Sequence, residues 1–206
     1  MIINLSELQD YTRRLAVKFP ALKDEILLRS PGCTGVECGR LKDSLPDLPG
    51  SYIECVQKFD LLGVAIGYFQ LSTGRFTGYS FVDGLISTNS LDKNPLLPFL
   101  RSNGLYEVGA YEADPICVST RKSRYAEGMV LRLSPPELIS RIMPLADNFE
   151  EFMLLVGNLD AIREKYSKSM NGINAVEEFI GILRNMQVSG EALASWRIIS
   201  EVVLSA

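Results

Sequence analysis

Three carboxylates in the middle of the chain, Glu107, Glu112 and Asp114, are the side chains that most readily suggest acid–base or metal chemistry. Successive side chains on a strand alternate between its two faces, so only Glu112 and Asp114 could share a face. Pro115 favours a bend or a sheet edge at this point, and such a bend would separate these two carboxylates. We therefore expect structural or solvated roles for all three.

The chain contains no histidine, the side chain most used for proton transfer near neutral pH. Ser-His-Asp and Cys-His hydrolases are therefore excluded. Cys33 and Cys38 lie close in sequence, but the other two cysteines stand alone, so a tetrahedral zinc site would need an unusual ligand set. No glycine pattern of a P-loop or a dinucleotide-binding turn occurs. The sequence predicts a protein that is not an enzyme and that holds neither a metal nor a cofactor.

The 206 residues include 47% apolar side chains, enough to bury the core of a single domain spanning residues 1–206. The net charge of −4 argues against direct binding to nucleic acid, which draws its affinity largely from Lys and Arg. Residues 1–20 lack the pattern of a secretory signal, and no apolar run approaches the roughly 20 residues of a membrane span. We expect a cytoplasmic protein, not attached to a membrane, with reduced cysteines.

Apolar residues at helical spacing predict helices toward both ends of the chain. Residues 5–28 should form one broken helix or two short ones, divided at Pro20. Asp147 and Glu150 resemble a capping box at the start of the clearest helical stripe. The further helices are expected at residues 45–59, 149–162, 173–186 and 191–204.

The middle of the chain is rich in β-branched and aromatic residues bounded by turns, a composition typical of strands. Residues 87–103 are expected to form a long surface connection, and the chain should return to helix after Pro135 and Pro136. The strands are expected at residues 64–71, 76–86, 105–119, with a break at Asp114-Pro115, and 129–133. This order indicates an α+β fold with a mainly antiparallel central sheet flanked by N-terminal and C-terminal helices.

Three sequence motifs within residues 36–166 resemble those of one protein superfamily, in the same order. The LPGSY sequence at residues 48–52, followed by Phe59-Asp60 and Gly63, is similar to a helix with the pattern LP-x-x-Y. The DPICV sequence at residues 114–118 resembles a strand written Gly-Asp-x-Ile-Cys-Leu, with Ala113 at the customary glycine. The LADNFEEF sequence at residues 145–152 is similar to a closing helix, Ala-x-Ser-Phe-x-Glu-Phe. Together they resemble the SUKH superfamily of Smi/Knr-like proteins.

This resemblance implies a function as well as a fold. Many bacterial members look like immunity proteins, so a non-catalytic module that neutralises a polymorphic toxin by direct binding is implied, as in a toxin–antitoxin pair. The fungal branch implies an alternative, an intracellular regulator or scaffold of cell-wall assembly. Tyr52, Phe149 and Phe152 should then be buried against the sheet.

The chain also departs from the SUKH pattern. An Ile-x-x-x-Glu helix that usually precedes LP-x-x-Y is echoed only by Val36, Glu37 and Leu41. Residues 1–30 and 167–206 lie outside the resemblance and are expected to be helical extensions.

The partner-binding surface is expected on outward-facing residues of the strands. Residues 43–114 carry nine acidic and four basic side chains, an excess that is either ordinary surface charge or a face that mimics nucleic acid toward a nuclease toxin. Aromatics gather in the same region, and those not in the core could serve as recognition residues. The predicted contact residues are Tyr79, Phe81, Glu107, Tyr111 and Glu112.

The C-terminal helical stripe contains the only tryptophan, Trp196, with Leu193, Ile199 and Val203 at helical spacing. We expect this stripe to pack on the domain. The alternative is a homodimer that forms through the C-terminal helix.

Overall fold

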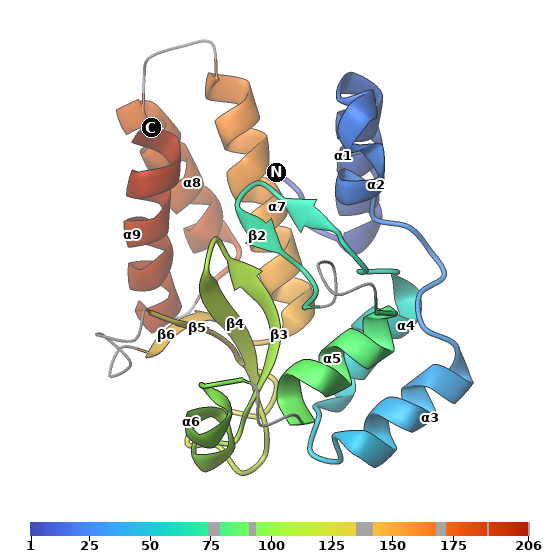
Figure 1. Ribbon diagram of the computed structural model, residues 1–206. Helices are drawn as coiled ribbons and strands as arrows, with labels where there is room; N and C mark the ends of the chain where they lie inside the picture. Colours follow the sequence, from blue (N-terminus) through green and yellow to red (C-terminus); the bar gives the residue numbers. More distant parts are fainter. Residues whose placement is uncertain (74–78, 91–93, 135–141, 168–171, 189, 206) are drawn as a thin grey trace.

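The computed structural model describes residues 1–73, 79–90, 94–134, 142–167, 172–188 and 190–205 (Figure 1). Helices begin and end the described chain, and the strands lie between them. In order, the elements are α1 (Leu5–Lys18), η1 (Pro20–Leu22), α2 (Lys23–Ile26), α3 (Gly35–Ser44), α4 (Gly50–Lys58), β1 (Ala65–Ile66), β2 (Phe69–Gln70), α5 (Phe81–Ser90), α6 (Leu97–Ser102), β3 (Leu105–Tyr111), β4 (Asp114–Ser119), β5 (Val130–Leu133), β6 (Ile142–Ala146), α7 (Phe149–Tyr166), α8 (Gly172–Asn185) and α9 (Gly190–Ser205).

The strands form one six-stranded antiparallel sheet in the order β1 to β6, in which each strand pairs with the next one along the chain. Strand β4 is buried on both faces. Ile116 and Val118 belong to the main core, whereas Cys117 belongs to a second apolar cluster with Leu131 and Leu100 of α6. The predicted α+β fold, with an antiparallel sheet between terminal helices, is confirmed.

Six buried aromatic side chains form the centre of the main core. Tyr52 of α4 meets Phe149 of α7 edge-on, with ring centroids 4.8 Å apart, and Phe149 packs against Phe152. The rings of Phe152, Phe69, Phe179 and Trp196 continue the cluster through β2, α8 and α9. Tyr52, Phe149 and Phe152 are 0%, 1% and 0% exposed, so their predicted burial is confirmed.

The N-terminal helices are fixed to α7. Pro20 begins η1, so the predicted break in residues 5–28 is confirmed. Asn158 of α7, 1% exposed, accepts from the Ile2 N–H and donates to the Ile2 carbonyl, both at 2.8 Å. At Gly157 an added Cβ would lie 2.4 Å from Leu8 Cδ1, so a side chain here would push α1 away from α7.

The outer edge of β6 is covered by α9. The Trp196 indole N–H donates to the Leu145 carbonyl at 2.6 Å, and Pro144 has no backbone N–H to offer a further strand. An uncovered strand edge invites pairing with another chain. Trp196 therefore packs on the domain as predicted, and it satisfies a backbone acceptor on β6.

The expected strand at residues 76–86 is wrong within the described residues, where Phe81–Ser90 forms helix α5. The Ser80 hydroxyl accepts from the Asp83 N–H at 3.2 Å and donates to its carboxylate at 2.7 Å, as a helix cap does. Phe81, Val82 and Leu85 then share one buried face. Part of the expected surface connection at residues 87–103 is also helical, because Leu100 of α6 belongs to the second apolar cluster and Phe99 packs against it.

Two expectations near residue 145 also need correction. Residues 142–146 form β6 instead of the expected helix, because Ala146 and Pro144 pair with β5. Residues 135–141 lie outside the described chain. The cap of α7 is Asn148, one residue later than predicted: its side chain accepts from the Glu151 N–H at 2.9 Å, and Glu151 accepts from the Asp147 N–H.

None of the described helices combines the length and the apolar composition that a membrane span requires.

Replacing Phe152 with Ala should lower the free energy of unfolding by about 3–5 kcal/mol, because a fully buried ring would leave a cavity between three aromatic neighbours, Phe69, Phe149 and Trp196. Chemical denaturation measures this change. Val36→Ala, at a side chain that is 85% exposed, is the control and should change stability by less than about 0.5 kcal/mol. A Phe152→Ala cost within the range of the control would contradict the packing described for this cluster.

Replacing Trp196 with Phe should cost about 1–3 kcal/mol, because much of the ring packing stays while the buried Leu145 carbonyl loses its donor. Thermal and urea unfolding of the variant provide the measurement. The rings of Phe179 and Phe152 should remain packed, so a larger loss accompanied by a weaker helical signal in far-UV circular dichroism would mean that α9 has detached.

Candidate partner-binding surface

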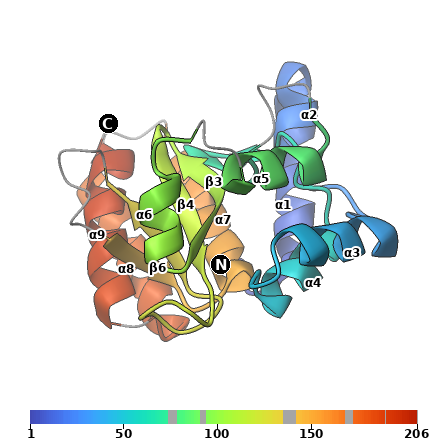
Figure 2. The ribbon, with the colours of Figure 1, turned by 60° about the horizontal axis from the view of Figure 1, so that its bottom comes forward.

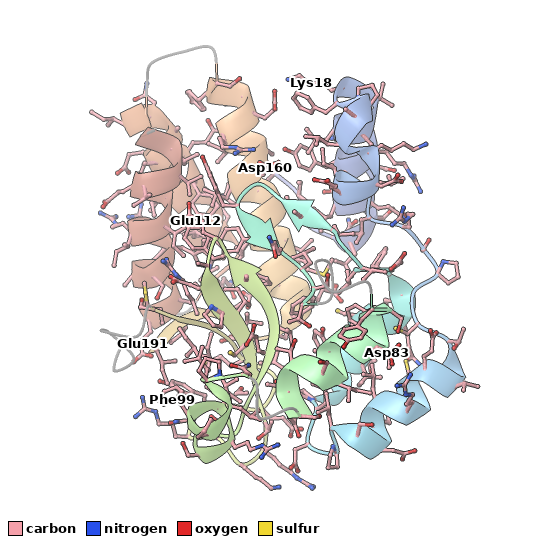
Figure 3. The ribbon with its side chains drawn as sticks, in the orientation of Figure 1. Lys18, Asp83, Phe99, Glu112, Asp160 and Glu191 are labelled. Carbon is pink, nitrogen blue, oxygen red and sulfur yellow. The ribbon has the colours of Figure 1, made fainter. Side chains whose placement is uncertain are left out.

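The five predicted contact residues do not form one surface. Tyr79 precedes α5 and is 47% exposed, but Phe81 is only 8% exposed. Tyr111, at the end of β3, is 3% exposed, and only Glu112 points from the β3–β4 turn into solvent. Figure 3 shows Glu112 well away from Asp83 at the start of α5. The expectation that all five face outward from strands is therefore wrong.

Glu107 is mostly enclosed by the protein, and both its backbone and its side chain are hydrogen-bonded to neighbouring segments. The Asn89 side chain accepts from the Glu107 N–H and donates to its carbonyl, both at 2.8 Å, and so takes the place of a neighbouring strand. The Glu107 carboxylate accepts from the Asn94 amide at 3.2 Å. Burial raises the pKa of Glu107, and the Asn94 hydrogen bond opposes this shift. The Glu107 backbone therefore anchors α5 to β3, and its carboxylate holds Asn94 in the segment after α5.

Tyr111 and Asp114 are held by Arg132 of β5. The Arg132 Nε donates to the Asp114 carboxylate at 2.7 Å, and its guanidinium lies 4.2 Å from the centre of the Tyr111 ring. Both partners of the ion pair are mostly buried. Asp114 therefore neutralises a buried cation, in agreement with the structural role expected for it, and does not join Glu107 or Glu112 in a catalytic group.

Four of the acidic side chains within residues 43–114 are paired with cations in the described part of the chain. Asp47 pairs with both Arg121 and Lys122, the basic hairpin tip between β4 and β5. The other acidic residues of this region with ion-pair partners are Asp60, Asp83 and Asp114, which pair with Arg29, Arg40 and Arg132. The described residues therefore do not present this excess as one unpaired acidic face.

Both faces of the sheet are covered, but the ends of two hairpins remain open. The Glu112 N–H donates to the Tyr68 carbonyl at 3.1 Å, so the β3–β4 turn lies against the β1–β2 turn. Gly67 opens that turn with a φ of +59°, a conformation that favours glycine. Tyr68 is 39% exposed, and the Arg163 guanidinium of α7 lies over its ring.

A pocket of about 240 Å³ adjoins these hairpin ends. Edge strand β1 and α7 line one side, and Phe19 and Leu22 of the α1–α2 connection line the other. These two side chains are 38% and 46% exposed. We call the region formed by Phe19, Leu22, Tyr68, Glu112 and Arg163 the strand-end surface. The sequence analysis predicted Glu112 but missed Phe19 and Leu22, whose exposure follows from the break at Pro20.

Asp160 lies beneath the strand-end surface and sets the position of Arg163. Its carboxylate, 5% exposed, accepts from the Tyr11 hydroxyl at 2.8 Å and from Arg163 Nη2 at 2.6 Å. Burial raises the pKa of Asp160, and Arg163 and Tyr11 counteract part of this shift. Burial and the nearby carboxylate raise the pKa of Tyr11. The network joins α1 and α7, and the Arg163 guanidinium over the Tyr68 ring extends it to the β1–β2 turn.

Within the described residues, no three Cys, Asp or Glu side chains gather closely enough to hold a metal ion. All four cysteines are free thiols. Burial raises the pKa of the half-buried Cys33 thiol to about 12, and the Cys38 thiol is also shifted upward by burial. These thiols are therefore protonated and poorly nucleophilic near neutral pH.

Asp160→Asn should flatten the pH dependence of stability. Because burial raises the native pKa of Asp160, the native state holds this proton more tightly than the unfolded chain does. The stability gained from this tighter proton binding is complete below the pKa of Asp160 in the unfolded chain. It is lost as pH rises through the pKa of Asp160 in the native state. Between about pH 4 and pH 7, the wild-type free energy of unfolding should therefore decline more than that of the variant. Urea unfolding across this range is the measurement.

Glu112→Gln removes a carboxylate at an exposed position and is the matched control. Its profile should follow that of the wild type. If stability of the wild type instead rose with pH relative to Asp160→Asn, attraction to Arg163 would outweigh burial at this carboxylate.

Comparison with known proteins found no match: no protein family, no curated protein and no solved structure is significantly similar to this chain. The resemblance of residues 48–52, 114–118 and 145–152 to the SUKH superfamily therefore stays a prediction.

Proposed function

We propose that this chain is a non-catalytic protein-binding module of the bacterial immunity type, which neutralises a toxin by direct binding in the cytoplasm. The observation that carries the proposal is the convergence of three motifs. Tyr52 from the first motif packs on Phe149 from the third, and Ile116 of the second lies in the same core. Because separate motifs of one fold must meet in its core, this packing supports the SUKH resemblance.

The surroundings of the carboxylates support a non-catalytic role. Asp114 is bound by Arg132, Glu107 by Asn94, and Asp160 by Tyr11 and Arg163. General acid–base catalysis requires a group that can reach a substrate proton. Each of these carboxylates is instead engaged by a neighbouring element of the fold.

The strand-end surface is the best candidate for the toxin contact. It combines two exposed aromatic rings, Tyr68 and Phe19, with a pocket and with charges of both signs. Buried aromatic anchors surrounded by charged side chains are typical of protein interfaces. The ion pairs of Asp47, Asp60 and Asp83 weaken the case for an acidic face that mimics nucleic acid, so the proposal does not depend on a nuclease partner.

Co-expression with toxin domains encoded beside this gene tests the proposal. Protection of the host, together with a stoichiometric complex of the two purified proteins, is the expected result. Absence of binding and protection with every neighbouring toxin would overturn it. Association with cell-wall synthesis enzymes in that case would favour the regulator or scaffold implied by the fungal branch.

With a toxin partner, Tyr68→Ala and Tyr79→Ala should behave differently. The two tyrosines are similarly exposed, at 39% and 47%, but only Tyr68 belongs to the strand-end surface. Loss of an aromatic anchor mainly speeds dissociation, by about tenfold or more, so Tyr68→Ala should do this and Tyr79→Ala should not. Surface plasmon resonance gives both rates. The reverse pattern would place the contact at the start of α5.

Glu112→Arg should change the association rate, with the largest effect at low salt, because an exposed charge at the edge of an interface acts mainly on electrostatic steering. Glu107→Gln is the comparison. It removes the same negative charge at a mostly buried position, keeps a side-chain oxygen that can accept from Asn94, and should leave the association rate of the folded protein unchanged. Equal association rates for wild type and Glu112→Arg at every salt concentration would exclude Glu112 from the encounter surface.

A further inference from the structure

Helix α9 forms an outer edge of the molecule in both Figure 1 and Figure 2. Its inward side is buried through Trp196, Ile199 and Val203. Its outward side presents Ile198 and Val202, which are 48% and 63% exposed. These two side chains are four residues apart, so they lie next to each other along the helix. An exposed apolar row of this kind is typical of a surface that associates with another protein.

A charged row runs beside the apolar one. Arg197 and Glu201 are both exposed and are also four residues apart. Neither forms an ion pair with another residue in the part of the chain that the structure describes. The outward side of α9 therefore carries a cation and an anion in a fixed order along its axis, adjacent to two apolar side chains.

The two ends of the apolar row differ in shape: Val202 projects into solvent at one end, and a groove lies beside Ile198 at the other. A groove of about 540 Å³ lies between the first half of α9 and strand β6. Its walls include Ala194 and Ile198 from α9, Met143 from β6 and Tyr125 from the β4–β5 connection. Val202, the most exposed of the apolar residues on α9, lies two turns beyond Ala194 and outside this groove.

We propose that two copies of this chain pair through α9, with the two helices antiparallel about a two-fold axis. A two-fold axis perpendicular to the helices keeps the charged row of each copy on the same side of the interface and reverses its direction. Arg197 then faces Glu201 of the partner subunit, and Glu201 faces the partner's Arg197. The partner's Val202 is directed toward the groove beside Ala194.

A second copy of the chain fits the outward side of α9 because Arg197 and Glu201 meet opposite charges on another α9 helix only when that helix runs antiparallel. A two-fold axis along parallel helices would instead carry the two charged rows to opposite sides of the interface, where Arg197 could not face Glu201 of the partner subunit. The antiparallel arrangement also fits the apolar row, since Val202 of each copy is directed toward the groove beside Ala194 of the other copy. The pairing uses none of the residues of the strand-end surface, so it does not depend on the proposed toxin contact.

Sedimentation velocity of the full chain, at concentrations up to roughly 1 mM, tests the pairing directly. We expect a reversible dimer. Val202→Glu should raise the dissociation constant by about tenfold or more, because it introduces a charge into the apolar row. Val36→Glu, at an exposed valine of α3, is the matched control and should leave the dimer intact. A wild type that stays monomeric at every concentration would overturn the proposal.

A charge exchange then tests the antiparallel direction. Arg197→Glu and Glu201→Arg should each weaken their own dimer, by about tenfold in the dissociation constant, because each puts like charges face to face. An equimolar mixture of the two variants should form a heterodimer as tight as the wild-type dimer, since both facing pairs regain opposite signs. Both variants carry one like-charged pair within α9, and thermal unfolding of each confirms that the helix remains folded. A mixture that associates no better than either variant alone would rule out this arrangement.

Discussion

The packing of Phe69 against Tyr111, Phe152 and Trp196 is the constraint on which the rest of the structure depends. Phe69 comes from a two-residue strand, yet its ring contacts β3, α7 and α9 at centroid separations of 4.7 to 5.7 Å. Without these contacts the β1–β2 hairpin would be too short to hold its place, since isolated hairpins are marginally stable. The same contacts fix the hairpin turn beside α7, where Arg163 and Tyr68 meet.

Polar side chains complete the fold by binding backbone groups that regular structure leaves open. Asn89 replaces a neighbouring strand at Glu107, Asn158 binds both backbone groups of Ile2, and Trp196 covers the carbonyl of Leu145. Each of these links joins elements far apart in sequence. Because an unpaired buried backbone group is costly, such side chains favour one arrangement of the helices around the sheet over its alternatives.

The covering of the sheet decides where a partner can bind. The aromatic core lies on one face, and α6 closes the other through Leu100 and its neighbours. Strand residues on the face opposite the main core are therefore buried too. Cys117 and Leu131 are examples. Solvent reaches the hairpin ends and the outward side of α9, and these two places carry the proposed toxin contact and the proposed pairing of two copies.

The sequence by itself determined the α+β class, the break at Pro20, the terminal helices and the burial of Tyr52, Phe149 and Phe152. These follow from local patterns, because helical spacing and turn residues act over a few neighbouring positions. The break expected at Asp114-Pro115 is wrong in position: the turn is formed by residues 112–113, and Asp114 and Pro115 pair with β3. Tertiary structure alone decided that residues 81–90 are helical, that residues 142–146 form a strand, and that Tyr111 and Phe81 are buried. In those segments the local sequence is compatible with either structure. Contacts with Glu107 for α5, with Val130 for β6 and with Arg132 for Tyr111 select the observed one. The proposed contact surface was least predictable, since it combines residues from the α1–α2 connection, α7 and two hairpin turns that only the folded chain brings together.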